Sequence, residues 1–107
     1  MVQRTIVWTV RSKQQLNNIL LYYFQRNRSN VYSQNLYTRI QQKLHLYTNH
    51  PLIGKKVKQY NVRVLFIDHC RLFYKITKKH LIILDLWDGR RNPQSIKYYK
   101  NEVDTKY

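Results

Sequence analysis

The segment RLFYKITKKHLIILDLW, residues 71–87, decides the fold class of this chain. Its first part alternates between the two sides of an extended strand, which carry Arg71, Phe73 and Lys75 on one side and Leu72, Tyr74 and Ile76 on the other. Lys78 and Lys79 form a short turn, and a turn of this length joins antiparallel neighbours. Residues 80–87 are almost continuously apolar, which predicts a strand inside a sheet with both faces buried.

The residues before this hairpin predict further parts of the sheet. Residues 62–67 predict a strand that joins the pair through a turn at 68–70, giving an antiparallel meander. The β-branched and aromatic residues 5–10 predict the first strand of the chain. Residues 54–58, which are rich in lysine, are predicted to form a basic loop that leads into the sheet.

Two helices are predicted between the first strand and the meander. Ser12 and Gln15 have the spacing of a capping box, which predicts that the first helix starts there. Ser29 follows a polar turn and is expected to cap the second helix, which ends before Pro51. Apolar stripes of helical period follow the two starts: Leu16, Ile19, Leu20, Tyr23 and Phe24, then Tyr32, Leu36, Ile40, Leu44 and Tyr47.

These elements predict one α+β domain over residues 1–107, with a tail at about 94–107. Its order is β-α-α-β-β-β, with a helical hairpin packed on a small, mainly antiparallel sheet. An apolar fraction of 43% supplies a core and excludes a disordered basic tail. The longest apolar runs are too short for a membrane helix or a secretory signal, and the single cysteine excludes an internal disulfide. The expected location is therefore the cytoplasm.

The charge of the chain is its strongest functional signal. Twenty Lys and Arg residues stand against five Asp and Glu, so the formal net charge is +15. Residues 1–67 contain no acidic residue. A charge of this size exceeds what solubility requires and points to a polyanionic partner, which could be nucleic acid, a nucleic-acid machine, an acidic protein or an anionic membrane surface.

The predicted sheet gathers many of these cations together with aromatic side chains. Arg and Lys suit phosphodiester binding and could stabilise a phosphorane, while aromatic rings could stack on bases. The alternative is a solvated sheet face on which long cations lie over apolar surface. The cations are Lys55, Lys56, Lys58, Arg63, Arg71, Lys75, Arg90 and Arg91, and the aromatic residues are Phe73, Tyr74, Tyr98 and Tyr99.

Other chemistry finds little support in the sequence. The four histidines are expected at turns and on the surface, and Cys70 beside His69 is too little for a zinc site. No cofactor is predicted, and two glycines are too few for a nucleotide-binding loop. Asp85, inside an apolar strand, is expected to pair with an arginine, while Trp8 and Trp87 are expected in the core.

Several motifs in this order resemble the RelE/ParE superfamily of bacterial type II toxin–antitoxin toxins. The resemblance begins at residues 6–10 and 16–20, and continues through a P-x-x-G exit from the hairpin at residues 51–54. It extends over the last three strands to the Gly-Arg-Arg motif at 89–91, so that it spans about residues 5–97. It implies the β-α-α-β-β-β fold already expected and an acidic antitoxin as partner.

The resemblance implies two modes of action. RelE-like members cleave mRNA on the ribosome by attack of a 2′-OH on the adjacent phosphate, without a metal. On that model Arg71 contacts the scissile phosphate, Arg91 helps to protonate the leaving group and Tyr98 is the nearby catalytic tyrosine. The substrate-binding residues would be Lys55, Lys56, Lys58, Arg63, Lys75, Arg90 and Tyr99. ParE-like members instead poison DNA gyrase and are not nucleases. We expect ribosome-dependent mRNA cleavage, with gyrase poisoning or non-enzymatic binding to RNA or the ribosome as alternatives.

Overall fold

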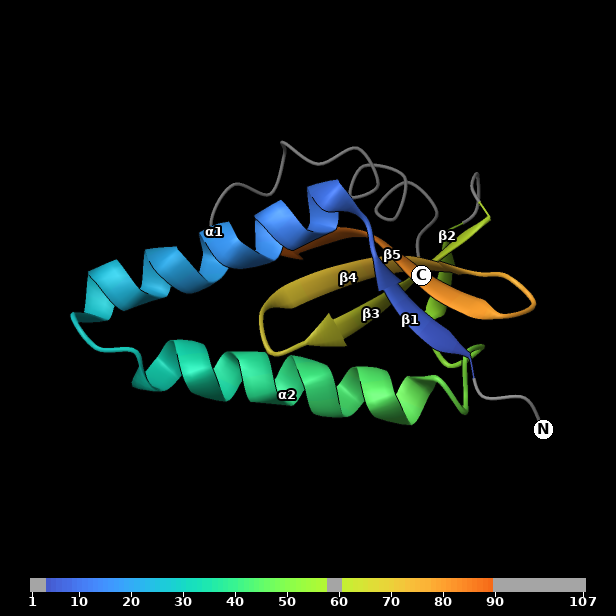
Figure 1. The fold of residues 1–107 in the computed structure, drawn as a ribbon, viewed down its shortest axis with the longest axis horizontal. Helices are drawn as coiled ribbons and strands as arrows, with labels where there is room; N and C mark the ends of the chain where they lie inside the picture. The colour runs from blue at the N-terminus through green and yellow to red at the C-terminus, as the bar shows by residue number, and fades with distance from the viewer. Residues whose placement is uncertain (1–3, 58–60, 90–107) are drawn as a thin grey trace.

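The computed structural model describes residues 4–57 and 61–89 and consists of two helices on a five-stranded sheet (Figure 1). The elements in chain order are β1 (Thr5–Trp8), α1 (Val10–Asn27), α2 (Val31–Tyr47), β2 (Lys55–Val57), β3 (Val62–Ile67), β4 (Cys70–Ile76) and β5 (His80–Asp88). The strand order is β1-β5-β4-β3-β2. β1 pairs in parallel with β5, and all other pairs are antiparallel. The predicted α+β class and the antiparallel meander are confirmed. The predicted tail lies outside the described residues.

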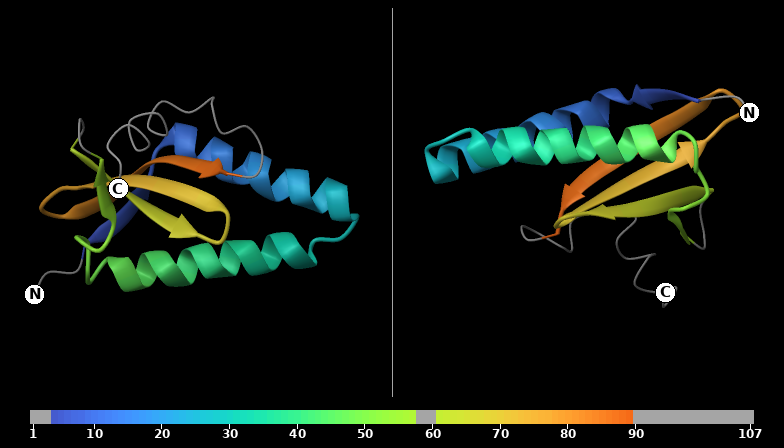
Figure 2. Two further views of the ribbon diagram at one scale, coloured as in Figure 1. Left: turned by 180° about the vertical axis from the view of Figure 1, so that it is seen from behind. Right: turned by 90° about the horizontal axis from the view of Figure 1, so that it is seen from below.

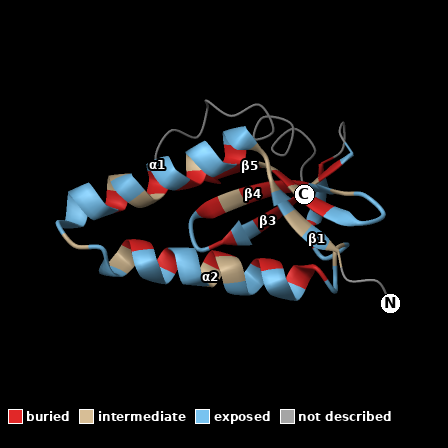
Figure 3. Cartoon of the chain, in the orientation of Figure 1, coloured by how far each residue is buried: buried red, intermediate tan, exposed pale blue. Residues whose placement is uncertain are grey.

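The two helices lie side by side on one face of the sheet, as the views in Figure 2 show. Their buried stripes meet the inward side chains of β3, β4 and β5, and red marks this layer in Figure 3. The helical part of the core consists of Leu16, Ile19, Tyr23, Leu36, Ile40, Leu44 and Tyr47. One predicted stripe residue, Phe24, is not part of the core, because it is 47% exposed, although its neighbour Tyr23 is buried.

Alternation along β4 divides the apolar residues between two faces, as predicted. Leu72, Tyr74 and Ile76 join the layer beneath the helices. Phe73 faces the other way and belongs to a second buried cluster with Val57, Val62, Val64 and Trp87. The predicted burial of β5 on both faces is confirmed for residues 85–88, which are all buried, whereas buried and half-buried residues alternate over 81–84. Trp8 packs against the main core, so both tryptophans are core residues as expected.

The sheet has an edge strand that the sequence does not predict. Residues 55–57 form β2, which pairs with β3, where a basic loop was predicted. The segment is only three residues long and contains two lysines, so it shows no apolar alternation. Short edge strands that carry lysine are common, because they discourage pairing with a second sheet.

The first helix begins earlier than the capping-box pattern predicts. Thr9 is the N-cap, and its hydroxyl oxygen accepts the backbone N–H of Ser12 at 3.1 Å. Ser12 itself is fully buried inside the first turn. Gln15 cannot complete a box, because its side chain reaches β5: it donates to Asp85 at 3.2 Å and accepts the N–H of Leu86 at 2.8 Å. The capping box does not form, because the side chain of Gln15 that it would need is bonded to β5.

The start of the second helix also differs in detail from the prediction. Asn30 is the N-cap and makes no side-chain capping bond. The hydroxyl of Ser29 nevertheless accepts the backbone N–H of Val31 at 3.2 Å, so the serine does serve the first turn as expected.

Carboxylates of β5 attach the first helix to the sheet. Asp85 is 4% exposed, and its Oδ1 lies 2.5 Å from Nε of Arg11, which confirms the predicted arginine partner. Leu84 has no partner on β4, because the register shifts between Phe73 and Tyr74. Near the end of β5, the hydroxyl of Tyr23 donates to Asp88. These bonds hold α1 over β5.

The end of α1 gives a test of backbone strain. Arg28 caps this helix with φ 51° and ψ 35°, a left-handed conformation that costs non-glycine residues free energy. We expect Arg28→Gly to raise the free energy of unfolding by about 0.5–1 kcal/mol, measured by urea denaturation. Arg26→Gly removes the same charge from inside the helix and should lower it by about 1 kcal/mol. Equal effects of the two changes would contradict the assignment of strain to Arg28.

Candidate functional site

The loop between α2 and β2 is held against the sheet by one tyrosine. The hydroxyl of Tyr74, on β4, donates to the carbonyl of Pro51 at 2.6 Å and accepts the N–H of Gly54 at 3.0 Å. A Cβ at position 54 would lie 2.7 Å from Cε1 of Tyr74, so the close approach requires glycine. The P-x-x-G pattern is therefore the spacing at which both loop ends reach one hydroxyl.

An arginine fixes the same loop from β3. Nη1 of Arg63 donates to the carbonyls of Leu52 at 3.2 Å and Gly54 at 2.8 Å. Its guanidinium thus lies under the loop, beside Tyr74, which is its partner across β3 and β4. With the two bonds to Tyr74, four hydrogen bonds hold a four-residue segment in place.

Three of the predicted cations line a hollow beside this loop. The hollow has a volume of about 230 Å³ and contains Lys56, Arg63 and Lys75. Its other described lining residues are Leu52, Asn61, Val62 and Ile76, so none of the described residues around it is acidic. Such a surface can bind an anionic group by charge and by hydrogen bonds from arginine and lysine.

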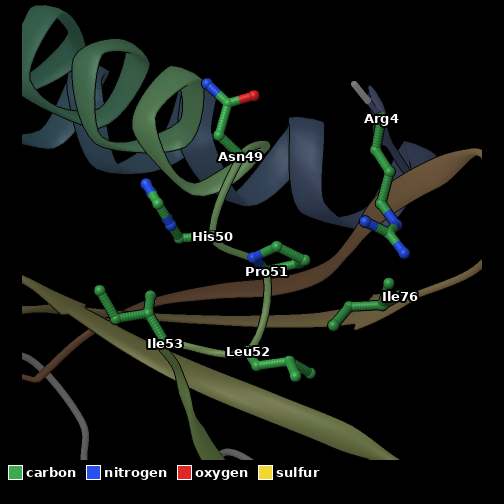
Figure 4. A pocket seen from close by; sticks show the side chains of 7 residues that line it. All are labelled: Arg4, Asn49, His50, Pro51, Leu52, Ile53 and Ile76. Carbon is green, nitrogen blue, oxygen red and sulfur yellow. The ribbon is translucent and has the colours of Figure 1, made fainter. Parts of the chain in front are cut away.

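A second, larger hollow adjoins the first, and its described lining combines the polar residues Arg4, Asn49 and His50 with the apolar residues Pro51, Leu52, Ile53 and Ile76. It has a volume of about 500 Å³ and shares Leu52 and Ile76 with the cationic hollow. Figure 4 shows the loop of residues 49–53 on one side, with Arg4 and Ile76 across from it. Nε of Arg4 donates to the carbonyl of Thr77 at 2.8 Å, which ties its side chain to the end of β4.

Arg71 lies elsewhere, on the sheet face turned away from the helices. It stands in a row across three strands, opposite Phe66 on β3 and Trp87 on β5. Its guanidinium carbon is 5.4 Å and 5.6 Å from the centres of these two rings, within the range of cation–π attraction. A Cβ at Gly89 would lie 2.9 Å from Nη1 of Arg71, so glycine leaves the space that this arginine fills.

Among the described residues, the cations that the sequence places on the sheet do not all share one face. Arg63 pairs opposite Tyr74 on the helix side, whereas Arg71 pairs opposite Phe66 on the other side, three residues along the strands. That offset alone separates them by about 10 Å. Lys55 lies opposite Val64 and so shares the face of Phe73. The predicted residues Lys58, Arg90, Arg91, Tyr98 and Tyr99 lie outside the described residues.

The expected base-stacking role fails for the two aromatic residues that can be assessed. Phe73 and Tyr74 are both 0% exposed, so neither ring offers a face to a base. The contacts of Phe73 and Tyr74 could not be predicted from the sequence, because alternation shows which face of a strand a residue is on but not what covers that face. Arg4 could not be predicted either, because its place in the larger hollow depends on a hydrogen bond to Thr77, far along the chain.

The histidines lie on the surface, as the sequence indicates. All four are exposed, whereas Cys70 is buried. Within residues 4–57 and 61–89, no three His, Cys, Asp or Glu side chains are grouped so as to hold a metal ion. Neither helix in the same ranges is long and apolar enough to cross a membrane.

Comparison with known proteins identifies the family. A family model described as "ParE toxin of type II toxin-antitoxin system, parDE" matches residues 6–93. This chain is a member of the ParE toxin family. A solved structure titled "Chromosomal ParDE TA system from P. aeruginosa" shares the fold, with a TM-score of 0.69 and 14% identity, over 80% of this chain and 96% of that chain. A search of curated proteins gave no match.

Membership in the ParE family makes this chain the toxin of a type II toxin–antitoxin system, with an antitoxin as partner. The predicted superfamily is thereby confirmed, and the match covers nearly all of the residues on which the resemblance was based. In this member of the family, two adjoining hollows lie at the hairpin exit, and Arg71 lies apart from them beside the rings of Phe66 and Trp87.

Removing the Tyr74 hydroxyl tests what holds the hairpin exit. Tyr74→Phe leaves the N–H of Gly54 without its acceptor in a buried position, so we expect the free energy of unfolding to fall by about 1–3 kcal/mol in urea denaturation. Tyr37→Phe, at a residue 43% exposed on α2, is the matched control and should change stability little. A Tyr74→Phe variant as stable as the wild type would show that the two bonds contribute nothing net.

The same tyrosine predicts a dependence on alkaline pH. Burial raises the pKa of the Tyr74 phenol above its ordinary value of 10.0, although the hydrogen bond from Gly54 and the charge of Arg63 act in the opposite direction. Above pH 10 the unfolded chain releases this proton more readily, so stability is lost as pH rises towards the folded pKa. We expect the fall in unfolding free energy above pH 10 to be shallower in Tyr74→Phe than in Tyr37→Phe, and identical slopes would contradict this.

Proposed function

We propose that this ParE-family toxin acts by binding and poisoning DNA gyrase, and not by cleaving mRNA. The observation that carries the proposal is the match to ParE toxins over residues 6–93, since members of that family typically poison gyrase. A gyrase poison needs a surface complementary to a protein–DNA machine, whereas a nuclease needs several groups around one phosphate. The expected preference for mRNA cleavage thus becomes the second candidate.

The arrangement of the described cations supports this choice. Metal-free cleavage of a phosphodiester needs donors that converge where negative charge develops in the transition state. Arg63 and Arg71 lie on opposite sides of the sheet, and the guanidinium of Arg63 already donates to two loop carbonyls. The buried rings of Phe73 and Tyr74 cannot hold a base beside them. The nuclease hypothesis therefore depends on Arg71 together with Arg91 and Tyr98.

Regulated expression separates the two modes of action. We expect induction of the wild-type chain to stop growth, induce a DNA-damage response and accumulate gyrase–DNA cleavage complexes, with mRNA 5′ ends unchanged. In vitro, the purified toxin should inhibit supercoiling by purified gyrase. Co-expression with an acidic protein encoded by a neighbouring reading frame should restore growth.

Site variants make the same experiment decisive about mechanism. On the nuclease hypothesis, Arg71→Ala abolishes cleavage, because that arginine would contact the scissile phosphate. Two results together would overturn the proposal in favour of mRNA cleavage. The wild-type toxin would produce mRNA cuts that Arg71→Ala does not produce, and the wild-type toxin would leave the activity of gyrase unchanged. Harmless expression of a folded wild-type chain, with neither readout changed, would favour non-enzymatic binding.

A further inference from the structure

Two large apolar side chains stand exposed on a loop that the fold holds firmly. Leu52 is 68% exposed and Ile53 is 58% exposed, although both lie between the ends of the segment bonded to Tyr74 and Arg63. Apolar side chains that remain in water cost solvation free energy, and exposed apolar patches rimmed by polar residues commonly mark binding sites. A fixed loop also loses little conformational entropy when a partner binds to it.

The surroundings of these side chains combine apolar surface with positive charge. The two hollows share Leu52 and Ile76, so they adjoin at the hairpin exit. We call the two hollows together the exit surface, and its described lining residues are Arg4, Asn49, His50, Pro51, Leu52, Ile53, Lys56, Asn61, Val62, Arg63, Lys75 and Ile76. Of these described residues, four are Lys or Arg and none is Asp or Glu.

We propose that the exit surface docks an acidic segment of the target gyrase that carries at least one large apolar side chain. The apolar side chain would enter the hollow of about 500 Å³, beside Leu52 and Ile76. Neighbouring carboxylates would meet Lys56, Arg63 and Lys75 in the hollow of about 230 Å³. This inference rests on the proposed function, because it names the surface through which the toxin reaches its target.

An acidic protein segment fits this surface better than a nucleic-acid strand or a second copy of this chain. A nucleic-acid strand would use the cations but leave Leu52 and Ile53 in contact with a charged backbone, and the described lining residues include no Phe, Tyr or Trp on which a base could stack. A second copy of this chain is disfavoured, because two chains of net charge +15 repel each other. An acidic segment with an apolar side chain satisfies both halves of the surface.

Binding of purified gyrase to purified toxin variants tests the inference. Lys56→Glu combined with Lys75→Glu should weaken binding by roughly tenfold or more, and Leu52→Ser should do the same with less dependence on salt. The matched controls are Lys13→Glu combined with Lys43→Glu, at exposed positions on the two helices, and Leu21→Ser, at a residue 50% exposed on α1. The charge controls carry the same net charge as the test variant, and all variants should unfold at the wild-type temperature because the changes are on the surface.

The possible results separate failure of the inference from failure of the proposed function. If the exit-surface variants bind and inhibit gyrase as the wild type does, or if the controls weaken binding equally, the docking site is overturned while gyrase poisoning stands. If the wild type itself neither binds nor inhibits gyrase, the proposed function fails, and this inference fails with it. Exit-surface variants that lose affinity only for a DNA duplex, or only for the antitoxin, would also overturn the docking of gyrase.

Discussion

The buried hydroxyl of Tyr74 is the contact on which the arrangement of the candidate site depends. It bonds to both ends of the segment from Pro51 to Gly54, where the helical hairpin turns into the sheet. Because that hydroxyl lies in the core on the central strand β4, the loop takes its position from the most buried part of the molecule. Arg63 donates to two other groups of the same loop, the carbonyls of Leu52 and Gly54, so its guanidinium lies at the hairpin exit.

This arrangement explains why so strongly charged a chain still folds with a divided cationic surface. The helices cover one face of the sheet, and a second apolar cluster lies on the other. Arg63 is on the helix side and bonds to the hairpin-exit loop, whereas Arg71 is on the opposite face beside two aromatic rings. The positive charge therefore acts as several local surfaces, each shaped by what lies beside it. Such surfaces favour recognition of a folded protein over convergence on one phosphate.

The sequence predicted those features that follow from periodicity. The alternation of residues 71–76, the stripes of the two helices and the apolar strand at 80–87 each depend on local pattern, and burial in one core preserves that pattern. Asp85 could be predicted to have an arginine partner because a lone carboxylate in an apolar strand needs one, but nothing local identifies Arg11. The three-residue strand β2 carried no periodic signal. The capping box failed because Gln15 bonds to β5, a contact between residues some 70 positions apart.

The candidate site was harder to predict, since it depends on which side of a strand meets which loop. Lys56, Arg63 and Lys75 line one hollow. Lys56 pairs opposite Arg63, and the loop between α2 and β2, which bonds to Tyr74 on β4, contributes Leu52 to the same hollow. Residue spacing correctly predicted that Arg63 and Arg71 are on adjacent strands. Whether two side chains on adjacent strands point to the same face of the sheet depends on the register of the strands, which spacing does not give. Their observed register shows them opposite Tyr74 and Phe66, on different faces. For a small basic toxin, register therefore determines whether its cations form a catalytic centre or separate docking surfaces, and composition alone carries no information about register.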